Sequence, residues 1–325
     1  RVHGQLVRTD FPPMEQEELA QTIYDLLTPA QEELFERDLE LDISHDVPGV
    51  ARFRVNIHRQ RGSVEASFRL IPESVPSADQ LGLPETVRRL ARRPNGLVLV
   101  TGPTGMGKTT TLAAMVDLIN HERECIIVTI EDPIEFVFAN DRSVIKQREI
   151  GADTHSFGQA LKHALRQDPN VIVVGELRDL ETIGTALTAA ETGHLVLATL
   201  HTPDAPQTIE RMIDVFPPHQ QQQVRLQVSE CLQGVVSQLL LPRADGEGRV
   251  LAAEVLVSTP GIRNMIREQQ IEQIPTAMQT GGKLGMRTMD RCLRVLVEEG
   301  RITLETALAK ARNGDEFSTF TGDKK

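Results

Sequence analysis

The sequence predicts an α/β protein built on a doubly wound, parallel sheet. Residues 102–109 read G-x-x-x-x-G-K-T and stand between an apolar run and a helical pattern, the strand–turn–helix order of a phosphate-binding P-loop. The apolar runs are continuous rather than alternating, which is typical of strands covered on both faces. These runs are expected as strands at 97–100, 126–130, 171–174 and 195–200, with helices between them.

A small α+β domain is expected before this core, over residues 1–75. Its strands are predicted at 2–7, 39–43, 51–58 and 63–71, and its first helix at 14–27. A second helix is predicted after Thr28, because Pro29 suits the first helical position and Gln31 completes a capping box. A polar stretch with prolines follows, so we place a linker at 76–82 and a second domain at 83–325, with a helical tail at about 260–313.

Composition narrows the class of protein. The chain has 325 residues and a formal net charge of −11, which argues against a protein that coats nucleic acid, so no nucleic-acid partner is expected. No apolar run reaches the length of about 18 residues that would suggest a membrane span. No signal peptide is recognisable, although the native N-terminus is expected to be missing. The cysteines, Cys125, Cys231 and Cys292, are far apart, which favours reduced thiols over disulfides or a zinc site.

The P-loop predicts how a nucleotide binds. Glycines at 102, 105 and 107 allow backbone N–H groups to converge on one anion, and the following helix adds the positive end of its dipole. Lys108 can reach the β- and γ-phosphates, and the Thr109 hydroxyl can bind Mg²⁺. The expected nucleotide-binding residues are Gly102, Pro103, Thr104, Gly105, Met106, Gly107, Lys108, Thr109 and Thr110.

Two carboxylates follow apolar strands, at the edge where open α/β sheets bind ligands. Glu131 ends the run at 126–130, and Glu176 follows the run at 171–174 in a Walker B-like pattern. Gly175 occupies the position of the usual aspartate, so Glu176 would have to supply the acid function alone or through water. The alternative for each is a solvated carboxylate at a strand end.

Four motif blocks, taken in order, resemble the type II/type IV secretion ATPases. Residues 102–109, 130–135 (IEDPIE), 174–179 (VGELRD) and 193–201 (GHLVLATLH) are similar to their Walker A, Asp box, atypical Walker B and His box. The likeness extends over essentially the whole chain. It implies a RecA-like core behind a PAS-like N-terminal domain, use of ATP with Mg²⁺, a homo-hexamer, and a cytoplasmic position at the inner membrane, at the base of a pilus or secretion machine.

The resemblance also implies catalytic roles. Glu176 would position or deprotonate the attacking water and, with Thr109, hold Mg²⁺ directly or through water. Glu131 would help through Mg²⁺ and water, and Lys108 through the phosphates. His194 and His201 would lie at either end of one strand, near the phosphates, in hydrogen-bonding or sensing roles rather than as metal ligands. The alternative for the histidines is a core position with no role.

Five arginines gather on the hairpin of the N-terminal domain: Arg52, Arg54, Arg59, Arg61 and Arg69. A solvated basic face is the simple interpretation. By resemblance, however, Arg54 and Arg69 match positions from which related ATPases present arginines to the γ-phosphate, in a neighbouring subunit. Arg61 is a weaker third candidate.

Two features favour the PilT-type retraction ATPases of type IV pili within this family. The chain has no C-x-x-C, whereas extension and type II secretion ATPases typically carry a tetracysteine zinc insert. Residues 260–268 resemble the Ala-Ile-Arg-Asn-Leu-Ile-Arg-Glu motif of that branch, with Gly261 and Met265 as departures, and 278–281 and 285–290 also look like it. The alternative for 260–268 is a plain amphipathic helix.

Retraction implies partners and leaves other functions open. The implied partners are a platform protein in the inner membrane and a paralogous motor ATPase. The alternatives are an accessory subunit of the PilU type with a nucleotide-gated binding role, another secretion ATPase such as a pilus extension motor, and a small-molecule P-loop kinase.

Overall fold

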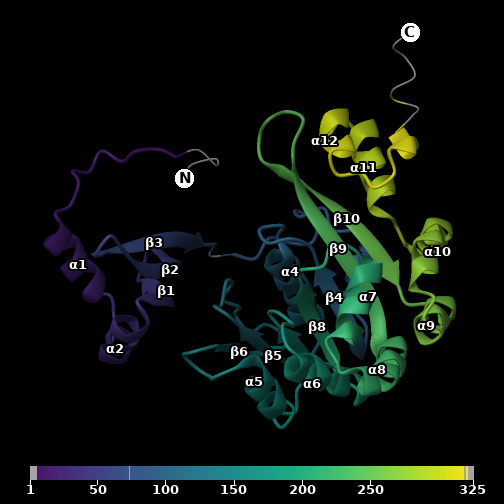
Figure 1. The fold of residues 1–325 in the computed structure, drawn as a ribbon, viewed down its shortest axis with the longest axis horizontal. Coiled ribbons are helices and arrows are strands. Elements are labelled where there is room, and N and C mark those ends of the chain that lie inside the picture. Colours follow the sequence, from purple (N-terminus) through teal and green to yellow (C-terminus); the bar gives the residue numbers. More distant parts are fainter. Residues whose placement is uncertain (1–5, 73, 318–319, 321–325) are drawn as a thin grey trace. The chain divides into compact units, whose positions relative to one another are not determined.

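The computed structural model describes residues 6–72, 74–317 and 320. The chain divides into two compact units (Figure 1). The smaller unit comprises Arg1–Ser74 together with the segment Pro133–Val137, and the larger unit comprises Val75–Asp132 and Phe138–Lys325.

The smaller unit combines two helices with a three-stranded antiparallel sheet. Its elements are α1 (Gln16–Tyr24), α2 (Pro29–Asp38), β1 (Glu40–Val47), β2 (Ala51–Gln60) and β3 (Ser63–Ile71), with the strands in the order β1-β2-β3. The predicted capping box is confirmed, because the Thr28 hydroxyl accepts from Gln31 N and the Gln31 side chain accepts from Thr28 N. The helices cover a core that includes Phe35, Val55 and Ile57.

Local differences from the predicted elements lie in the first strands of this unit. Leu6 and Val7 are not in a strand, and residues 2–5 of that predicted strand lie outside the described residues. The strand predicted at 39–43 instead runs over Glu40–Val47, and Leu39 ends α2 with a left-handed φ of 65°. The part of this strand beyond residue 43 was not predicted because it is rich in polar residues, which a sheet with one solvent-exposed face can accommodate.

The larger unit is built on a seven-stranded sheet in the order β10-β9-β4-β8-β7-β5-β6. All pairs are parallel except β9 with β10. The four strands predicted for the core are confirmed. Strands β6 and β9 were not predicted. The strands are β4 (Gly96–Thr101), β5 (Ile126–Glu131), β6 (Val144–Glu149), β7 (Val171–Val174), β8 (Leu195–Leu200), β9 (Leu232–Pro242) and β10 (Arg249–Val257).

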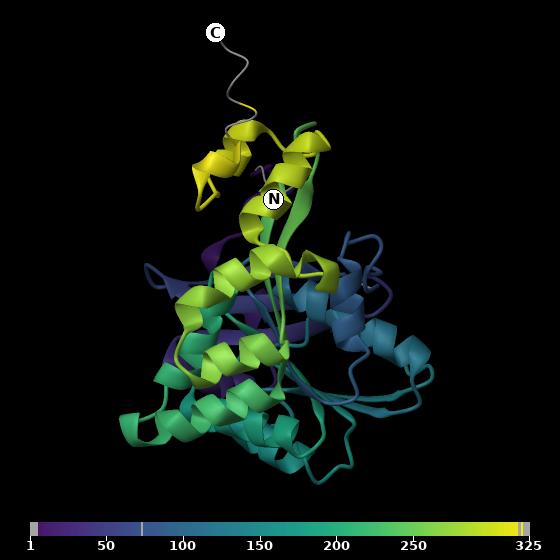
Figure 2. The ribbon, with the colours of Figure 1, turned by 90° about the vertical axis from the view of Figure 1, so that its right-hand side faces the viewer.

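Helices cover both faces of this sheet, which confirms the doubly wound architecture (Figure 2). Alternate residues of β4 show the two faces, since Leu97 and Leu99 join one core while Val98 and Val100 join the other. Helices α3 (Glu85–Ala91) and α4 (Lys108–Glu122) pack on the second of these cores. The first core is covered by α5 (Phe157–Ala164), α6 (Leu180–Glu191), α7 (Ala205–Asp214), α8 (Pro218–Cys231) and α9 (Pro260–Arg267).

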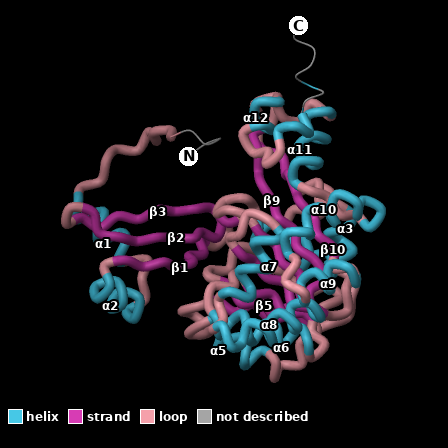
Figure 3. Tube along the Cα trace, turned by 45° about the vertical axis from the view of Figure 1, so that its right-hand side comes forward, coloured by secondary structure: helices cyan, strands magenta, loops and turns pink. Residues whose placement is uncertain are grey.

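The predicted helical tail is also confirmed. After α9 it contains α10 (Ile274–Thr280), α11 (Met289–Glu298) and α12 (Leu304–Leu308), with short 3₁₀ turns between and after them. Figure 3 shows α11 and α12 beside the end of the long β9–β10 hairpin. Leu241 and Val250 of this hairpin are buried in one cluster with Met289 and Leu293 of α11, so the tail is anchored on the hairpin.

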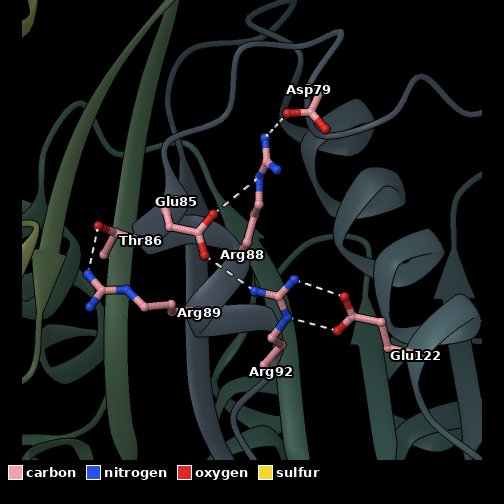
Figure 4. Close-up of polar contacts among 7 residues, drawn as sticks. All are labelled: Asp79, Glu85, Thr86, Arg88, Arg89, Arg92 and Glu122. Atoms are coloured by element: carbon pink, nitrogen blue, oxygen red, sulfur yellow. Dashed lines mark hydrogen bonds and ion pairs between the residues drawn. The ribbon is translucent and has the colours of Figure 1, made fainter.

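Helix α3 ties three segments of the larger unit together (Figure 4). Arg88 pairs with Asp79 in the turn before the helix, and Arg92 holds Glu122 at the end of α4 through two contacts of 2.8 Å. On its other side, the Thr86 hydroxyl donates to Gly285 O at 3.1 Å. The helix therefore contacts the turn that precedes it, the P-loop helix and the C-terminal tail.

Candidate functional site

The P-loop lies between β4 and α4, as its motif predicts. Gly102, Gly105 and Gly107 have φ values of 140°, 79° and 77°, in the region that L-residues with a Cβ rarely adopt. Lys108 opens α4 and is buried, and its Nζ donates to the carbonyls of Gly102 (2.9 Å) and Pro103 (3.1 Å). The loop therefore brings the N-terminus of α4 and an ammonium group together, an arrangement that suits an anion.

Glu176 follows Gly175, the first residue after β7, on the same edge of the sheet. A Cβ on Gly175 would lie 3.2 Å from the carbonyl oxygen of Ile130 on β5, so a larger residue here would have to displace a neighbouring backbone by a few tenths of an ångström. This close approach favours glycine where a Walker B strand usually has aspartate. Glu176 therefore supplies the carboxylate at this strand end.

Both carboxylate oxygens of Glu176 have partners. Oε2 lies 2.8 Å from the Arg178 guanidinium, and Oε1 lies 3.2 Å from His201 Nε2. Partial burial raises the pKa of Glu176, but the hydrogen bond from Arg178 and the charge of His201 outweigh it, so the pKa lies below its usual value. Glu176 is therefore ionised at neutral pH and is able to accept hydrogen bonds.

His201 connects this carboxylate to the P-loop. It follows β8, the strand between β4 and β7, and its Nδ1 lies 3.2 Å from the Thr104 hydroxyl. Because the ionised Glu176 carboxylate can only accept, His201 Nε2 is the donor in this pair. The structure thus brings together three residues that the sequence separates: Thr104, Glu176 and His201.

His194 does not join this group. It precedes β8, and its carbonyl accepts from Gly96 N at the start of β4, the opposite end from the P-loop. Its ring Nδ1 lies 3.0 Å from Ala189 O. The expectation that both histidines lie near the phosphates is therefore wrong for His194, because a strand places its two ends far apart.

Glu131 ends β5, which is separated from the P-loop strand by β7 and β8. Its buried Oε1 accepts from the Thr129 hydroxyl at 2.6 Å and from the Gln147 side chain at 3.2 Å. Gln147 belongs to β6, one of the two strands that were not predicted. The role of Glu131 in catalysis stays a prediction.

Arg54 and Arg69 lie directly opposite each other on β2 and β3 of the smaller unit. Like charges in this position destabilise a sheet unless an anion offsets them. The Glu135 carboxylate lies 4.0 Å from Arg54, at the limit of an ion pair. These two arginines therefore form a cationic pair with little internal compensation.

The remaining hairpin arginines have structural contacts or a turn position. Arg52 donates to the Ser44 hydroxyl at 2.8 Å. Arg59 pairs with Glu36 at 2.7 Å and lies over the Phe35 ring, 5.6 Å from its centre. Arg61 occupies the hairpin turn with a φ of 51°.

Strands β9 and β10 contribute residues near the P-loop that no sequence motif indicated. The Gln238 side chain donates to Met106 O in the P-loop at 2.6 Å, and Arg249 of β10 donates to Gly105 O at 3.3 Å. Gln238 stands in a mixed run of apolar and polar residues with no motif of its own. Only the pairing of β9 with β4 reveals its position.

Several other sequence expectations concern metals, thiols and membranes. Among the described residues, no group of three or more His, Cys, Asp or Glu side chains could hold a metal ion, which is compatible with Mg²⁺ held by a hydroxyl, a carboxylate and phosphates. Burial raises the pKa of the Cys231 thiol to about 12, so this buried cysteine is unreactive. None of the helices within the described ranges is long and apolar enough to cross a membrane.

Comparison with known proteins places this site in a family. Residues 2–309 match the family model described as "Type II/IV secretion system protein". The chain belongs to this family. A solved structure, "Crystal Structure of the Pilus Retraction Motor PilT and Bound ADP", has a similar fold. Its TM-score against this chain is 0.86, and the two are 48% identical over 92% of this chain and 85% of that one.

Named relatives within the family have similar lengths. The type IV pilus retractation ATPase PilT of Pseudomonas aeruginosa is 51% identical over 98% of this chain and 92% of its own length. The twitching motility protein of Neisseria gonorrhoeae is 48% identical over 98% of this chain and 85% of its own. The type IV pilus ATPase PilU of Pseudomonas aeruginosa is less similar, at 38% identity.

Proposed function

We propose that this chain is an ATPase that powers the retraction of type IV pili. The observation that carries the proposal is the hydrogen-bonded connection from the P-loop through His201 to Glu176, found in a chain 51% identical to a retraction ATPase over nearly its whole length. A P-loop alone would indicate only binding. An ionised carboxylate joined to it supplies a group that can orient water.

The residues present fit a nucleotide with Mg²⁺. Residues 102–110 would hold the phosphates through backbone N–H groups, and Lys108 would exchange the carbonyls of Gly102 and Pro103 for phosphate oxygens. Thr109 and Glu176 would hold Mg²⁺, directly or through water. The ion would neutralise charge on the phosphates. Glu176 would orient the attacking water and accept its proton.

The cationic pair Arg54–Arg69 supports a site completed by a second copy of the chain. Two directly opposed guanidinium groups are suited to bind a phosphate that another subunit presents. We therefore propose a homo-hexamer in which residues 1–75 act as a PAS-like domain, joined by the linker 76–82 to the motor domain 83–325. Movement about the linker would convert ATP hydrolysis into mechanical work.

Retraction is favoured over the alternatives by two observations. The identity to the retraction ATPase is 51%, against 38% for the PilU paralogue of the same organism. In α9, Ile262 and Ile266 are buried while Asn264 and Arg267 are exposed, as is Glu268 directly after the helix. The polar part of the motif at 260–268 is therefore open to a partner. We propose that the partner is an inner-membrane platform protein, and that the motor works in the cytoplasm. An accessory PilU-like role and a pilus extension motor are the competing functions.

Complementation tests the proposal. A retraction-deficient strain should recover filament retraction with the wild-type gene and not with Lys108→Ala, because the substitution removes the ammonium group from the phosphate site. Purified wild-type protein should hydrolyse ATP. ATP hydrolysis without restored retraction would point to another secretion ATPase, and absence of hydrolysis would favour the accessory role.

A further inference from the structure

We infer that Gln238 is a positioning residue that sets the shape of the phosphate-binding loop from the neighbouring strand β9. The inference rests on the proposed nucleotide-binding function and adds a residue outside every recognised motif of the chain. Its evidence is the contact between Gln238 and Met106, which are 132 positions apart in the sequence.

The contact holds the middle of the loop in place. Gln238 is 1% exposed, and its side chain donates to Met106 O at 2.6 Å. The donating atom must be Nε2, since a backbone carbonyl only accepts. The backbone N–H of Leu240, two residues further along β9, points to the Met106 sulfur at 3.2 Å. Both the backbone and the side chain of Met106 are therefore held against β9.

Holding this carbonyl orients the next amide. In a planar trans peptide, the C=O of Met106 and the N–H of Gly107 point in opposite directions. The carbonyl points toward β9, so the Gly107 N–H points away from it. The β9 side is already filled, because a Cβ on Gly107 would lie 3.3 Å from the Leu240 side chain and 3.5 Å from Gln238 Nε2. The Gly107 amide is thus directed in advance to where a phosphate oxygen would lie, and needs no reorganisation on binding.

The first glycine of the loop shows the same dependence on β9. A Cβ on Gly102 would lie only 2.4 Å from the Gln238 carbonyl oxygen, so the backbone of β9 packs directly against the start of the loop. The neighbouring Thr101 and Ser237 hydroxyls, both fully buried, are joined by a hydrogen bond of 2.9 Å. The two strands are therefore locked in register where the loop begins.

The other end of the Gln238 amide indicates what the residue is for. Among the described residues, its Oε1 is buried without a hydrogen-bond partner. Such a group costs free energy, and a leucine of similar size would avoid the cost. Packing of the strand does not explain an amide at this position. The hydrogen bond that its NH2 group donates to the P-loop does.

Three variants test the inference by calorimetric titration with ADP. Q238L removes the donor and keeps the size, and it should raise the Kd for ADP about fivefold or more, the loss expected for one hydrogen bond. Q238E places an ionised carboxylate against the Met106 carbonyl and should weaken binding at least as much at about pH 8. At about pH 6 the buried carboxyl becomes protonated and donates to the carbonyl, so its Kd should approach that of the wild type measured at the same pH. The Q238L-to-wild-type ratio should stay constant with pH.

The matched control is Q233L, on the same strand. The Gln233 side chain lies against Gly96, at the opposite end of β4 from the P-loop. Its Kd for ADP should equal that of the wild type. Equal Kd values for Q238L and wild type would overturn the inference. It would also be overturned if Q238L and Q238E showed the same pH behaviour and lost melting temperature equally, because that result would indicate packing alone. Failure of wild type and Q233L to bind ADP would instead overturn the proposed function.

Discussion

His201 Nε2 lies 3.2 Å from Glu176 Oε1, while the other nitrogen of the same ring lies 3.2 Å from the Thr104 hydroxyl. The histidine therefore contacts both the loop that would hold the phosphates and the carboxylate that would orient water. Under the proposed function, a change at Thr104 on nucleotide binding would reach Glu176 through a single side chain. This arrangement gives a physical reason for a histidine at the end of β8.

The Glu176 carboxylate should be required for turnover and not for binding. E176Q keeps the size of the side chain but replaces one acceptor oxygen by an amide NH2, and the amide is far too weak a base, so kcat should fall about a hundredfold or more. The Kd for ADP should change little. Steady-state ATPase assays and calorimetry measure the two quantities. The control is E210Q, at an exposed position of α7, which should keep both values.

Arg178 should control the pH dependence of hydrolysis. Its guanidinium helps to hold the pKa of Glu176 below the usual value, so the base stays ionised as the pH falls. R178A should raise the pKa of Glu176 and shift the acidic limb of the kcat/KM profile to higher pH. An unchanged acidic limb would refute this role. R294A, on the exposed surface of α11, serves as the control.

Gly285 should be needed for the contact between α3 and the tail. Its φ is +84°, and a Cβ would lie 2.0 Å from the Thr86 hydroxyl oxygen, so G285A introduces both backbone strain and a clash. Gly246 has a similar φ of +80° with nothing within 4 Å of the added Cβ, so G246A isolates the strain. Denaturant unfolding should show G285A to be less stable than G246A by about 1–3 kcal/mol. Equal free energies of unfolding for the two variants would show that the neighbouring residues move to accommodate the added Cβ without loss of stability.

The arginines of the β2–β3 hairpin should separate into two classes. Removing Arg59 breaks its ion pair with Glu36 and its contact with Phe35, so R59A should lower the melting temperature. The double variant R54Q/R69Q removes two opposed charges and should not lower it. If these two arginines serve a neighbouring subunit, the ATPase rate of the double variant should fall about a thousandfold. A normal rate would favour a solvated basic face.

Much of this protein follows from local sequence patterns. The P-loop at 102–109 requires glycines for its backbone angles, and Thr28 with Gln31 predicts a helix start because both partners lie within one turn. The apolar runs of the core strands are continuous because helices cover both faces of the sheet. Each of these patterns involves residues close together in the chain, so it can be recognised without knowledge of the fold.

Only the tertiary structure decided which of these residues meet. Strand β4 pairs with β8 and β9, which follow it by about a hundred residues or more, and no local pattern specifies these neighbours. This pairing brings His201 to Thr104 and Glu176, leaves His194 at the far edge, and places Gln238 against Met106. The sequence by itself thus determined the loop and the carboxylate. The strand order determined which residues contact them, and this order depends on packing between segments that are distant in the chain.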